Sequence, residues 1–562
     1  MKCEFKIYLQ NNWNHFQCTK TIGNAFYNDE LLKGIELTKF IDNKFAKKNY
    51  KIINKLNGFF CILYKNDKNI IIASDIIRSF PLFYSLNENL IFISDNPHWI
   101  KKFYFKNNID EVSKLEFLLT GYVTGKETLY KNIKQLQAAE MISFDLNQYH
   151  NIKSFRYYNF FEHEDFKINY KKLFQLHDYL INDVFKRLIK YANNRKIVIP
   201  LSGGFDSRLV ALMLKKLNYK NILSFTFGEY NCNEYKVSKE VANNLKIDWE
   251  FIPYDNQKTQ TWYNSNEKIR FNKIGSNLSN ILLDRQFPAV WKLTLDKIIT
   301  QNSIFVPGHT ADFISGGHVP FNIFERPDKK DLINAIVNKN YVMWRLKNKD
   351  LKKIFKEKIG QILDSQSHFK SIKADRIYEN WEWQERQVKL IINSSTRLYE
   401  FWNHDWWFPF WDKDYVQFWN RVPLRFRINN RLYQDYVIEL YSKIGGLSKK
   451  KAKKRDNNLN KLNSIKYEIN KIIKFMPFGN KIKRFYIKIA NIFRKFGPKQ
   501  NELYESDWSK AYGRMNIKLY KKLLPYIIGR TSCITLEALG LISFTDDKIS
   551  EEAINILEKI QN

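Results

Sequence analysis

One stretch of this sequence constrains the fold more than any other. It runs from Ile197 to Arg208 and joins a strand pattern to a helix pattern. Residues 197–199 are β-branched and apolar, as in an interior parallel strand, whereas residues 208–217 are rich in Leu, Val, Ala and Met, as in a packed helix. Gly203 and Gly204 lie between the two patterns. The stretch therefore predicts a strand, a tight glycine turn and a helix start, which together form the basic unit of an α/β fold.

The turn has the chemistry of a phosphate-binding loop. Its two glycines let backbone N–H groups approach an anion with no Cβ in the way, and a helix N-terminus adds donors and the positive end of its dipole. Ser202 and Ser207 supply hydroxyl groups, and a carboxylate such as Asp206 beside a polyphosphate implies a divalent cation between them. The alternative is an ordinary strand-to-helix turn that contains two glycines.

The spacing of the loop follows neither the Walker A pattern nor Gly-x-Gly-x-x-Gly. Its Ser-Gly-Gly-x-Asp-Ser sequence resembles the pyrophosphate loop of the ATP pyrophosphatase superfamily, whose members cleave ATP between the α and β phosphates. The resemblance implies a site for ATP and pyrophosphate. The expected binding residues are Leu201, Ser202, Gly203, Gly204, Asp206, Ser207, Phe227, Gly228 and Gly308.

A doubly wound parallel sheet is predicted around this loop. Residues 222–227 have the pattern of the next strand, residues 249–252 that of another, and a helical stretch separates them. Residues 170–191 form an amphipathic helix that leads into the first strand. In such sheets ligands bind outside the carboxyl ends of the strands, where the loop and residues 227–228 would lie.

Residues 1–155 show short strands with tight breaks between them, which predicts stacked antiparallel sheets. In order and spacing, residues 56–60, 74–78 and 81–84 resemble the later strands of the N-terminal glutaminase domain of asparagine synthetases. The resemblance implies an Ntn-hydrolase-like α+β sandwich.

The residues that glutamine hydrolysis requires are replaced. A working glutaminase of this family has a cysteine directly after the initiator methionine, and the free α-amine of that cysteine is the base for its own thiol. Here Lys2 occupies that position and Cys3 follows it. The glutamine-holding motif Asn-Gly-Glu-Ile-Tyr-Asn is also missing. We therefore predict a degenerate glutaminase-like domain that releases no ammonia from glutamine.

A second strand-to-turn stretch, residues 304–318, resembles the asparagine synthetase motif Ser-Gly-Glu-Gly-Ala-Asp-Glu-Leu-Phe-Gly-Gly-Tyr. The residues in register are Gly308, Ala311, Asp312, Gly316 and Gly317. In relatives the acid that matches Asp312 joins the one that matches Asp206 in holding magnesium on the phosphates. Two carboxylates suit a hard cation that takes oxygen ligands. The alternative for Asp312 is a carboxylate that caps a helix.

His309 replaces a residue that differs among the relatives. Asparagine synthetases have a glutamate there, and β-lactam synthetases have a tyrosine, supported by a carboxylate, that helps to deprotonate the attacking amine. Counting back from Pro409 gives Asp405 as the matching carboxylate. A histidine oriented by a carboxylate accepts protons near neutral pH, so His309 with Asp405 is the predicted base dyad. The alternative is a polar residue that lines the site.

The resemblance weakens beyond Pro423. Relatives place a lysine in this region that neutralises charge on the phosphates during adenylation, and Lys449 or Lys451 fits that spacing best. The alternative for this lysine run is a solvated loop. Residues 456–562 are predicted to form a basic helical extension of plain surface helices, and the alternative is that these helices touch an anionic surface, either a membrane or a nucleic acid.

Composition narrows the possible compartments and partners. The formal net charge of +34 favours an anionic partner or surface, or reflects a nucleotide-biased genome. The 5 cysteines are scattered and form no Cys-x-x-Cys pair, which is typical of a reducing compartment. No apolar run reaches the roughly 18 residues that a membrane span needs, and the polar N-terminus does not have the pattern of a secretory signal. A cytoplasmic location is the expectation.

The sequence thus predicts three parts: a degenerate glutaminase-like domain over residues 1–155, an ATP pyrophosphatase domain over 156–455, and the extension over 456–562. The predicted function is an ATP-dependent, AMP-forming ligase that adenylates a carboxylate and transfers it to ammonia or an amine. Asparagine synthesis from aspartate, an ATP-binding pseudoenzyme and a nucleic-acid-modifying ATP pyrophosphatase are the alternatives. The carboxylate, the nitrogen donor and the oligomeric state are left open.

Overall fold

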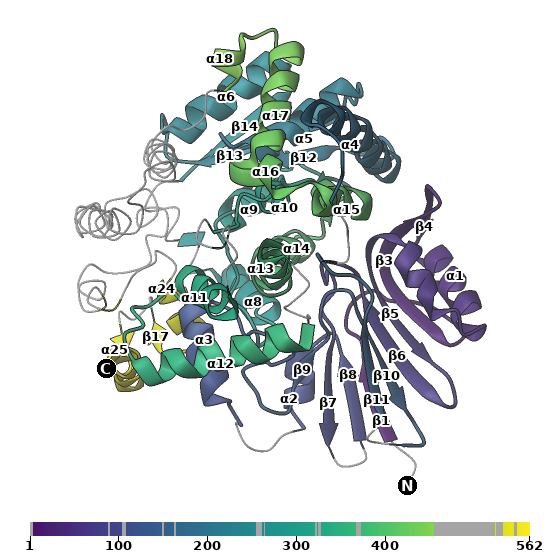
Figure 1. The fold of residues 1–562 in the computed structure, drawn as a ribbon, viewed down its shortest axis with the longest axis vertical. Coiled ribbons are helices and arrows are strands. Elements are labelled where there is room, and N and C mark those ends of the chain that lie inside the picture. Colours follow the sequence, from purple (N-terminus) through teal and green to yellow (C-terminus); the bar gives the residue numbers. More distant parts are fainter. Residues whose placement is uncertain are drawn as a thin grey trace.

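The structure is a computed structural model of the 562-residue chain. It describes residues 4–87, 90–103, 108–148, 151–161, 165–254, 261–262, 265–320, 323, 328–366, 373–453, 523, 526, 532–543 and 548–562. Figure 1 shows the parallel sheet and its helices in the upper part of the view, the N-terminal sheets at the lower right and a group of helices at the lower left.

Two sheets form the N-terminal part. Their strands are β1 Glu4–Tyr8, β2 Asn14–Phe16, β3 Thr19–Tyr27, β4 Glu30–Lys33, β5 Asn57–Lys65, β6 Asn69–Ser74, β7 Phe83–Asn87, β8 Leu90–Ser94, β9 Lys134–Gln135, β10 Glu140–Asp145 and β11 Ile152–Arg156. One sheet has the order β1-β8-β7-β9 and the other the order β11-β10-β6-β5-β3-β2, with β4 paired to β3. The predicted antiparallel pairing is confirmed for all pairs but β1 with β8, which is parallel.

Alternating apolar side chains explain why the larger sheet is covered on both faces. Cys61 and Leu63 of β5 belong to the core between the two sheets, whereas Phe60 and Ile62 pack against helix α1, Ile35–Ala46. Because successive residues of a strand point to opposite faces, one run of apolar residues supplies both cores.

The second part is built on a parallel sheet of five strands, which are β12 Ile197–Pro200, β13 Ile222–Gly228, β14 Asp248–Pro253, β15 Ile304–Phe305 and β16 Asp405–Trp406. Their order is β14-β13-β12-β15-β16, and every pair is parallel. The chain leaves β12 for β13 on one side and later returns to β15 on its other side. The topological switch point therefore lies between β12 and β15.

Helices pack around this sheet, against the N-terminal sheets and in the group at the lower left of Figure 1. Their bounds are α2 Pro97–Lys101, α3 Glu111–Thr120, α4 Tyr170–Ala192, α5 Phe205–Lys216, α6 Asn233–Leu245, α8 Asn266–Gly275, α9 Phe287–Leu295, α10 Ala311–Ile314, α11 Lys329–Asn340, α12 Lys349–Gln366, α13 Ala374–Glu382, α14 Asn393–Phe401, α15 Lys413–Arg421, α16 Leu424–Arg427, α17 Arg431–Ile444 and α18 Lys449–Ala452. Between α13 and α14 the backbone continues as a π-helix, Trp383–Ile392. Figure 1 shows α13 and α14 near the centre of the molecule.

The C-terminal end packs into the molecule and is not a free extension. Helices α24, Ser532–Ala538, and α25, Glu551–Gln561, flank the short hairpin of β17, Ile542–Ser543, and β18, Lys548–Ile549. Leu536 and Leu557 share one buried core with Leu118 of α3 and Phe355 of α12. The described part of the predicted extension thus contains two helices, and apolar residues of these helices complete this core.

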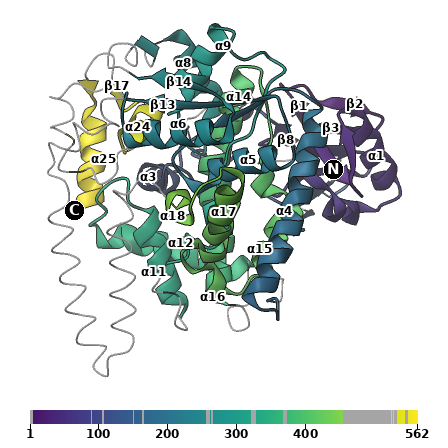
Figure 2. The ribbon, with the colours of Figure 1, turned by 90° about the horizontal axis from the view of Figure 1, so that it is seen from above.

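Residues 456–522, 524–525, 527–531 and 544–547 of the predicted basic extension lie outside the described residues, as does Cys3. In Figure 2, α25 and α1 lie at opposite edges of the molecule. None of the described cysteines forms a disulfide. Within the described ranges, no helix combines the length and the apolar character that crossing a bilayer requires.

Candidate active site

A cleft of about 370 Å³ opens at the carboxyl ends of the central strands. Residues that follow β12 line one part of it, and residues that follow β15 line another. Because β12 and β15 are the neighbours at the switch point, the fold itself places the cleft there. Leu201, Ser202, Asp206, Ser207, Phe227, Gly308, His309 and Asp312 are the predicted site residues that line it.

The loop after β12 is held by its own serines. The Ser202 N–H donates to Ser207 Oγ at 2.9 Å, and the Gly204 N–H donates to Ser202 Oγ at 3.2 Å. Helix α5 begins at Phe205 with Gly204 at its N-cap, where no side chain makes a capping hydrogen bond. A helix N-terminus without a side-chain cap is a ready site for a phosphate group. The structure thus gives the strand, loop and helix that the sequence predicted.

Gly308 allows the second motif to reach this loop. A Cβ built on Gly308 would lie 2.3 Å from the Ser207 nitrogen and 2.5 Å from the Asp206 carbonyl carbon. Any side chain at this position would therefore push the start of α5 away from the loop after β15. The glycine is required by this close backbone approach.

Asp206 and Asp312 meet at the floor of the cleft. The Asp312 N–H donates to Asp206 Oδ2 at 3.3 Å, and the Tyr433 hydroxyl donates to Asp206 Oδ1 at 2.9 Å. Among the described residues no group of three or more His, Cys, Asp or Glu side chains could hold a metal ion. Two carboxylates nevertheless fit Mg²⁺, which usually takes one or two protein carboxylates and completes its shell with phosphate oxygens and water.

Asp312 has a second partner that the sequence did not predict. His318 Nε2 lies 3.2 Å from Asp312 Oδ2, and His318 Nδ1 lies 2.5 Å from Glu382 Oε1 at the end of α13. Burial lowers the pKa of His318, but Glu382 and Asp312 outweigh burial and raise the pKa to about 9. Burial raises the pKa of Asp312, but His318 outweighs it and holds that pKa at about 2.

His309 lines the cleft next to Asp312 and stacks on Phe408 with ring centroids 6.4 Å apart. Burial lowers its pKa to about 4, against the opposing charge of Asp312. The imidazole is therefore neutral near pH 7 and has a lone pair that can accept a proton.

The predicted dyad of His309 with Asp405 is wrong. Asp405 pairs with Ile304 in the parallel register, so it lies at the start of β15, whereas His309 follows the other end of that strand. Its carboxylate accepts hydrogen bonds from the Tyr191 hydroxyl at 2.9 Å and from Arg195 Nη1 at 2.6 Å. These residues line a separate cavity of about 600 Å³ beside the N-terminal sheets.

The structure does not bring the two predicted lysines to the cleft. Lys449 forms an ion pair with Glu439 at 2.7 Å on the surface, and Lys451 is exposed on the same short helix α18. Neither residue lines the cleft, because α18 follows the far end of α17. Of the glycines, Gly203 and Gly204 shape the loop, and Gly228 ends β13 with a φ of 135°.

Sequence reasoning missed the π-helix side of the cleft. Arg386, Gln387 and Ile391 line it from that helix, and Glu234 lines it from α6. The Glu382-Arg386 spacing is an i,i+4 charge pair, but this pattern is common on surface helices and indicates no site by itself. His318 stands at the tyrosine position of the asparagine synthetase motif. This substitution was the sequence signal that could have pointed to His318 as a site residue.

Comparisons with known proteins agree with the motifs. Residues 38–158 match the glutamine amidotransferase domain family. The chain is 25% identical over 305 residues to the Microcin J25-processing protein McjC of Escherichia coli, which covers 52% of this chain and 53% of that protein. It is 26% identical over 223 residues to a Methanocaldococcus jannaschii protein named as a glutamine-hydrolysing asparagine synthetase, covering 36% and 42% respectively. The chain thus spans about half the length of the curated relatives it matches.

Two solved structures resemble parts of this chain at low identity. An NH3-dependent NAD synthetase from Campylobacter jejuni is 14% identical with a TM-score of 0.20, over 38% of this chain and 96% of that one. A tRNA methyltransferase subunit from Methanocaldococcus jannaschii is 20% identical with a TM-score of 0.14, over 26% and 64%. Likeness at this level bears on neither fold nor function.

The amidotransferase match covers strands β5 to β11 of the N-terminal sheets, and the name of the Methanocaldococcus jannaschii relative agrees with the resemblance of the loop and the second motif. Together these matches show that the chain is similar to asparagine synthetase-like proteins.

Proposed function

We propose that this protein is an ATP-dependent, AMP-forming carbon–nitrogen ligase. One observation carries the proposal: the uncapped N-terminus of α5, its glycine loop and the carboxylates of Asp206 and Asp312 converge on a single cleft. The first two suit a phosphate chain, and the two carboxylates suit the cation that such a chain requires.

The proposed reaction has two steps. A carboxylate oxygen of the substrate attacks the α phosphorus of ATP, and pyrophosphate leaves. The nitrogen of ammonia or an amine then attacks the carbonyl carbon of the acyl-adenylate, loses a proton, and AMP departs as the amide forms. Donors fixed in advance around the leaving group stabilise its charge, which is the usual source of catalysis in such sites. Bound Mg²⁺, held by Asp206 and Asp312, would supply further charge neutralisation.

His309 is the proposed proton acceptor for the amine. It lines the cleft beside Asp312, and it is the histidine that replaces the variable family residue. Because Asp405 lies outside the cleft, the proposal does not include it as the carboxylate that orients His309. Conversion of the amine to an amide would fall in a His309→Ala variant while formation of the adenylate persisted.

We propose that the N-terminal part has an Ntn-type glutaminase fold that no longer hydrolyses glutamine. The match of residues 38–158 to the amidotransferase family and the two stacked sheets support the fold. The missing Asn-Gly-Glu-Ile-Tyr-Asn motif, which holds glutamine in working glutaminases of this type, supports the loss of glutamine hydrolysis. Free ammonia or an amine is then the nitrogen source.

The test is exchange of labelled pyrophosphate into ATP over a panel of carboxylic acids. The panel includes aspartate, uronic acids and peptides with acidic side chains, since one relative is named for processing a microcin. Exchange that depends on one carboxylate, and that is lost in an Asp206→Asn variant, supports the ligase. Exchange with aspartate alone favours asparagine synthesis, exchange that requires RNA favours a nucleic-acid-modifying enzyme, and exchange with none favours an ATP-binding pseudoenzyme.

A further inference from the structure

The π-helix Trp383–Ile392 contacts the N-terminal part of the chain and also lines the cleft. In a π-helix the hydrogen bonds run from i to i+5, so side chains four or five positions apart share a face. Arg386, Gln387 and Ile391 line the cleft, whereas Glu385 and Lys389 do not. The helix therefore has one face for the cleft and another for the N-terminal part.

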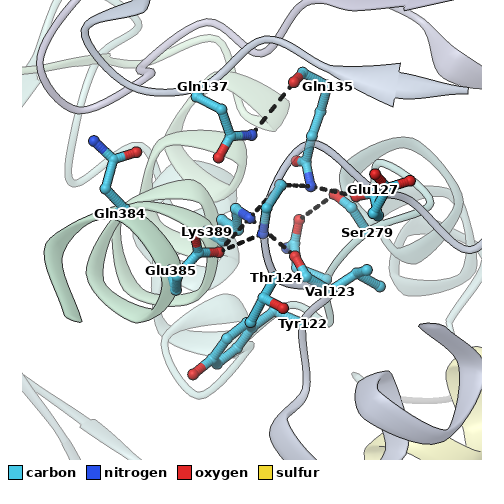
Figure 3. A network of polar contacts seen from close by, with 12 residues as sticks. Tyr122, Val123, Thr124, Glu127, Gln135, Gln137, Ser279, Gln384, Glu385 and Lys389 are labelled. Atoms are coloured by element: carbon cyan, nitrogen blue, oxygen red, sulfur yellow. Dashed lines mark hydrogen bonds and ion pairs between the residues drawn. The ribbon is translucent and has the colours of Figure 1, made fainter. Parts of the chain in front are cut away.

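Glu385 and Lys389 form a buried ion pair on the second face. Lys389 Nζ lies 2.6 Å from Glu385 Oε2, and the two side chains are 1% and 0% exposed. Lys389 also donates to the carbonyls of Val123 at 2.9 Å and Gly125 at 2.8 Å, which uses all three of its protons. The Gly125 N–H donates back to Glu385 Oε2 at 2.9 Å. Figure 3 shows this network around the loop that follows Tyr122.

Two further side chains of the π-helix contact the same part of the chain. Trp383 Nε1 donates to the Ile76 carbonyl at 2.7 Å, and Gln384 Nε2 donates to the Ala138 carbonyl at 3.5 Å. The loop itself is braced from the sheet side, since Gln135 Nε2 donates to the carbonyls of Gly125 and Glu127. All these backbone groups lie within residues 38–158, the segment that matches the amidotransferase family.

The opposite face of the helix is tied to the floor of the cleft. Gln387 Nε2 donates to Glu382 Oε1 at 3.1 Å and lies 3.3 Å from His318 Nδ1. Arg386 Nη1 donates to the same Glu382 oxygen at 3.2 Å. A shift of the π-helix would therefore move the guanidinium of Arg386 and the partners of His318 together, while the start of α5 stayed in place.

We propose that Glu385 and Lys389 are positioning residues through which the N-terminal domain fixes the substrate wall of the cleft. This is the role that the domain keeps in place of glutamine hydrolysis. Replacing a buried ion pair by apolar residues of similar size is often neutral or stabilising, so the value of this pair lies in the geometry that it sets. The inference rests on the proposed function, because it takes the carboxylate substrate to bind beside Arg386 and ATP to bind at the start of α5.

The test variant is the double substitution Glu385→Gln with Lys389→Met. It removes both charges, keeps similar volumes and retains an acceptor for the Gly125 N–H, whereas Lys389→Met alone would strand a buried carboxylate. The control is Lys268→Met with Asp284→Asn, because that ion pair is equally buried, spans 2.7 Å and has no member that lines the cleft.

Three quantities are measured on the full chain: the KM for the carboxylate in pyrophosphate exchange, the Kd for ATP, and hydrogen exchange of the peptide over residues 383–392. We expect the double variant to raise the carboxylate KM at least about tenfold, to leave the Kd for ATP within about twofold, and to exchange faster over the π-helix. The control should change none of the three. An unchanged carboxylate KM, or an equal loss of ATP affinity, overturns the positioning role.

Failure of the proposed function gives a different pattern. Wild-type protein would then show no carboxylate-dependent exchange, and hydrogen exchange would remain as the readout. If residues 383–392 exchanged no faster in the double variant than in wild-type protein, the N-terminal domain would not hold the π-helix.

Discussion

Gly308→Ala tests the geometry of the cleft with one methyl group. The new Cβ would lie 2.3 Å from the Ser207 nitrogen, and real contacts of this kind do not fall below 3.0 Å, so the backbones must separate by about 0.7 Å. The displaced atoms are the first turn of α5 and the backbone of Asp206, which are the groups proposed to hold the phosphates. The substitution therefore acts on ATP through position alone, since no functional group is lost.

The expected loss follows from that displacement. A misplacement of about 1 Å in an active site costs about 100-fold in rate, so 0.7 Å predicts a loss of about 10- to 100-fold in kcat/KM, or about 1.4–2.7 kcal/mol of transition-state stabilisation. The assay is carboxylate-dependent pyrophosphate exchange, together with thermal unfolding to show that the variant is folded.

Gly360→Ala is the matched control. Gly360 lies inside α12, and the nearest atom to its new Cβ would be Ile333 Cδ1 at 3.6 Å, which is ordinary contact. Alanine in a helix interior stabilises by about 0.5–1 kcal/mol relative to glycine, and exchange should be unchanged. A Gly308→Ala protein that exchanged pyrophosphate at the wild-type rate would refute the account of the close approach.

Three further predictions concern other parts of the chain. Asp405→Asn should change the rate of pyrophosphate exchange by less than about twofold, since Asp405 binds Tyr191 and Arg195 outside the cleft. A loss of about 100-fold would instead support a catalytic role for Asp405. Burial lowers the pKa of His177 to about 3. Below about pH 6.5 this side chain is therefore protonated in the unfolded chain but stays neutral in the folded chain, and the free energy of unfolding falls by up to about 1.4 kcal/mol per pH unit. His177→Phe, which suits the surrounding aromatic rings, should flatten the loss of denaturation midpoint between pH 6.5 and 5, and an equally steep loss would contradict this. Incubation with glutamine should release no glutamate above a no-protein control, whereas steady release would show a working glutaminase.

Features that depend on local sequence could be predicted. The run from Ile197 to Arg208 contains its own strand, turn and helix start, and the structure places β12 and α5 there. The pair of Asp206 and Asp312 could also be inferred, since each follows a strand of one parallel sheet and the carboxyl ends of those strands meet at one edge.

Features that depend on tertiary register could not be predicted. Strand β16 has two residues, so no periodicity marks it, and its pairing with β15 alone determines that Asp405 lies beside Ile304. Counting back from Pro409 gave Asp405, which lies at the end of the strand away from the cleft. Local sequence carries no information about such a register, because parallel neighbours come from distant parts of the chain.

The π-helix side of the site could not be predicted for the same reason. Residues 383–392 contain no proline or glycine and have the composition of an ordinary α-helix. Their contacts reach His318 in one direction and Gly125 in the other, across long sequence separations. Only the folded chain shows that this segment joins the amidotransferase-like part to the cleft.

The most direct test of the central claim follows one oxygen atom. Adenylation transfers a carboxylate oxygen of the substrate to the phosphate of AMP, because that oxygen attacks the α phosphorus and departs with it when the nitrogen attacks the carbonyl carbon. The measurement is mass spectrometry of the nucleotide product after reaction with the active carboxylate labelled with ¹⁸O. The account predicts AMP that contains one ¹⁸O atom, and unlabelled AMP, or label in inorganic phosphate beside ADP, would contradict it.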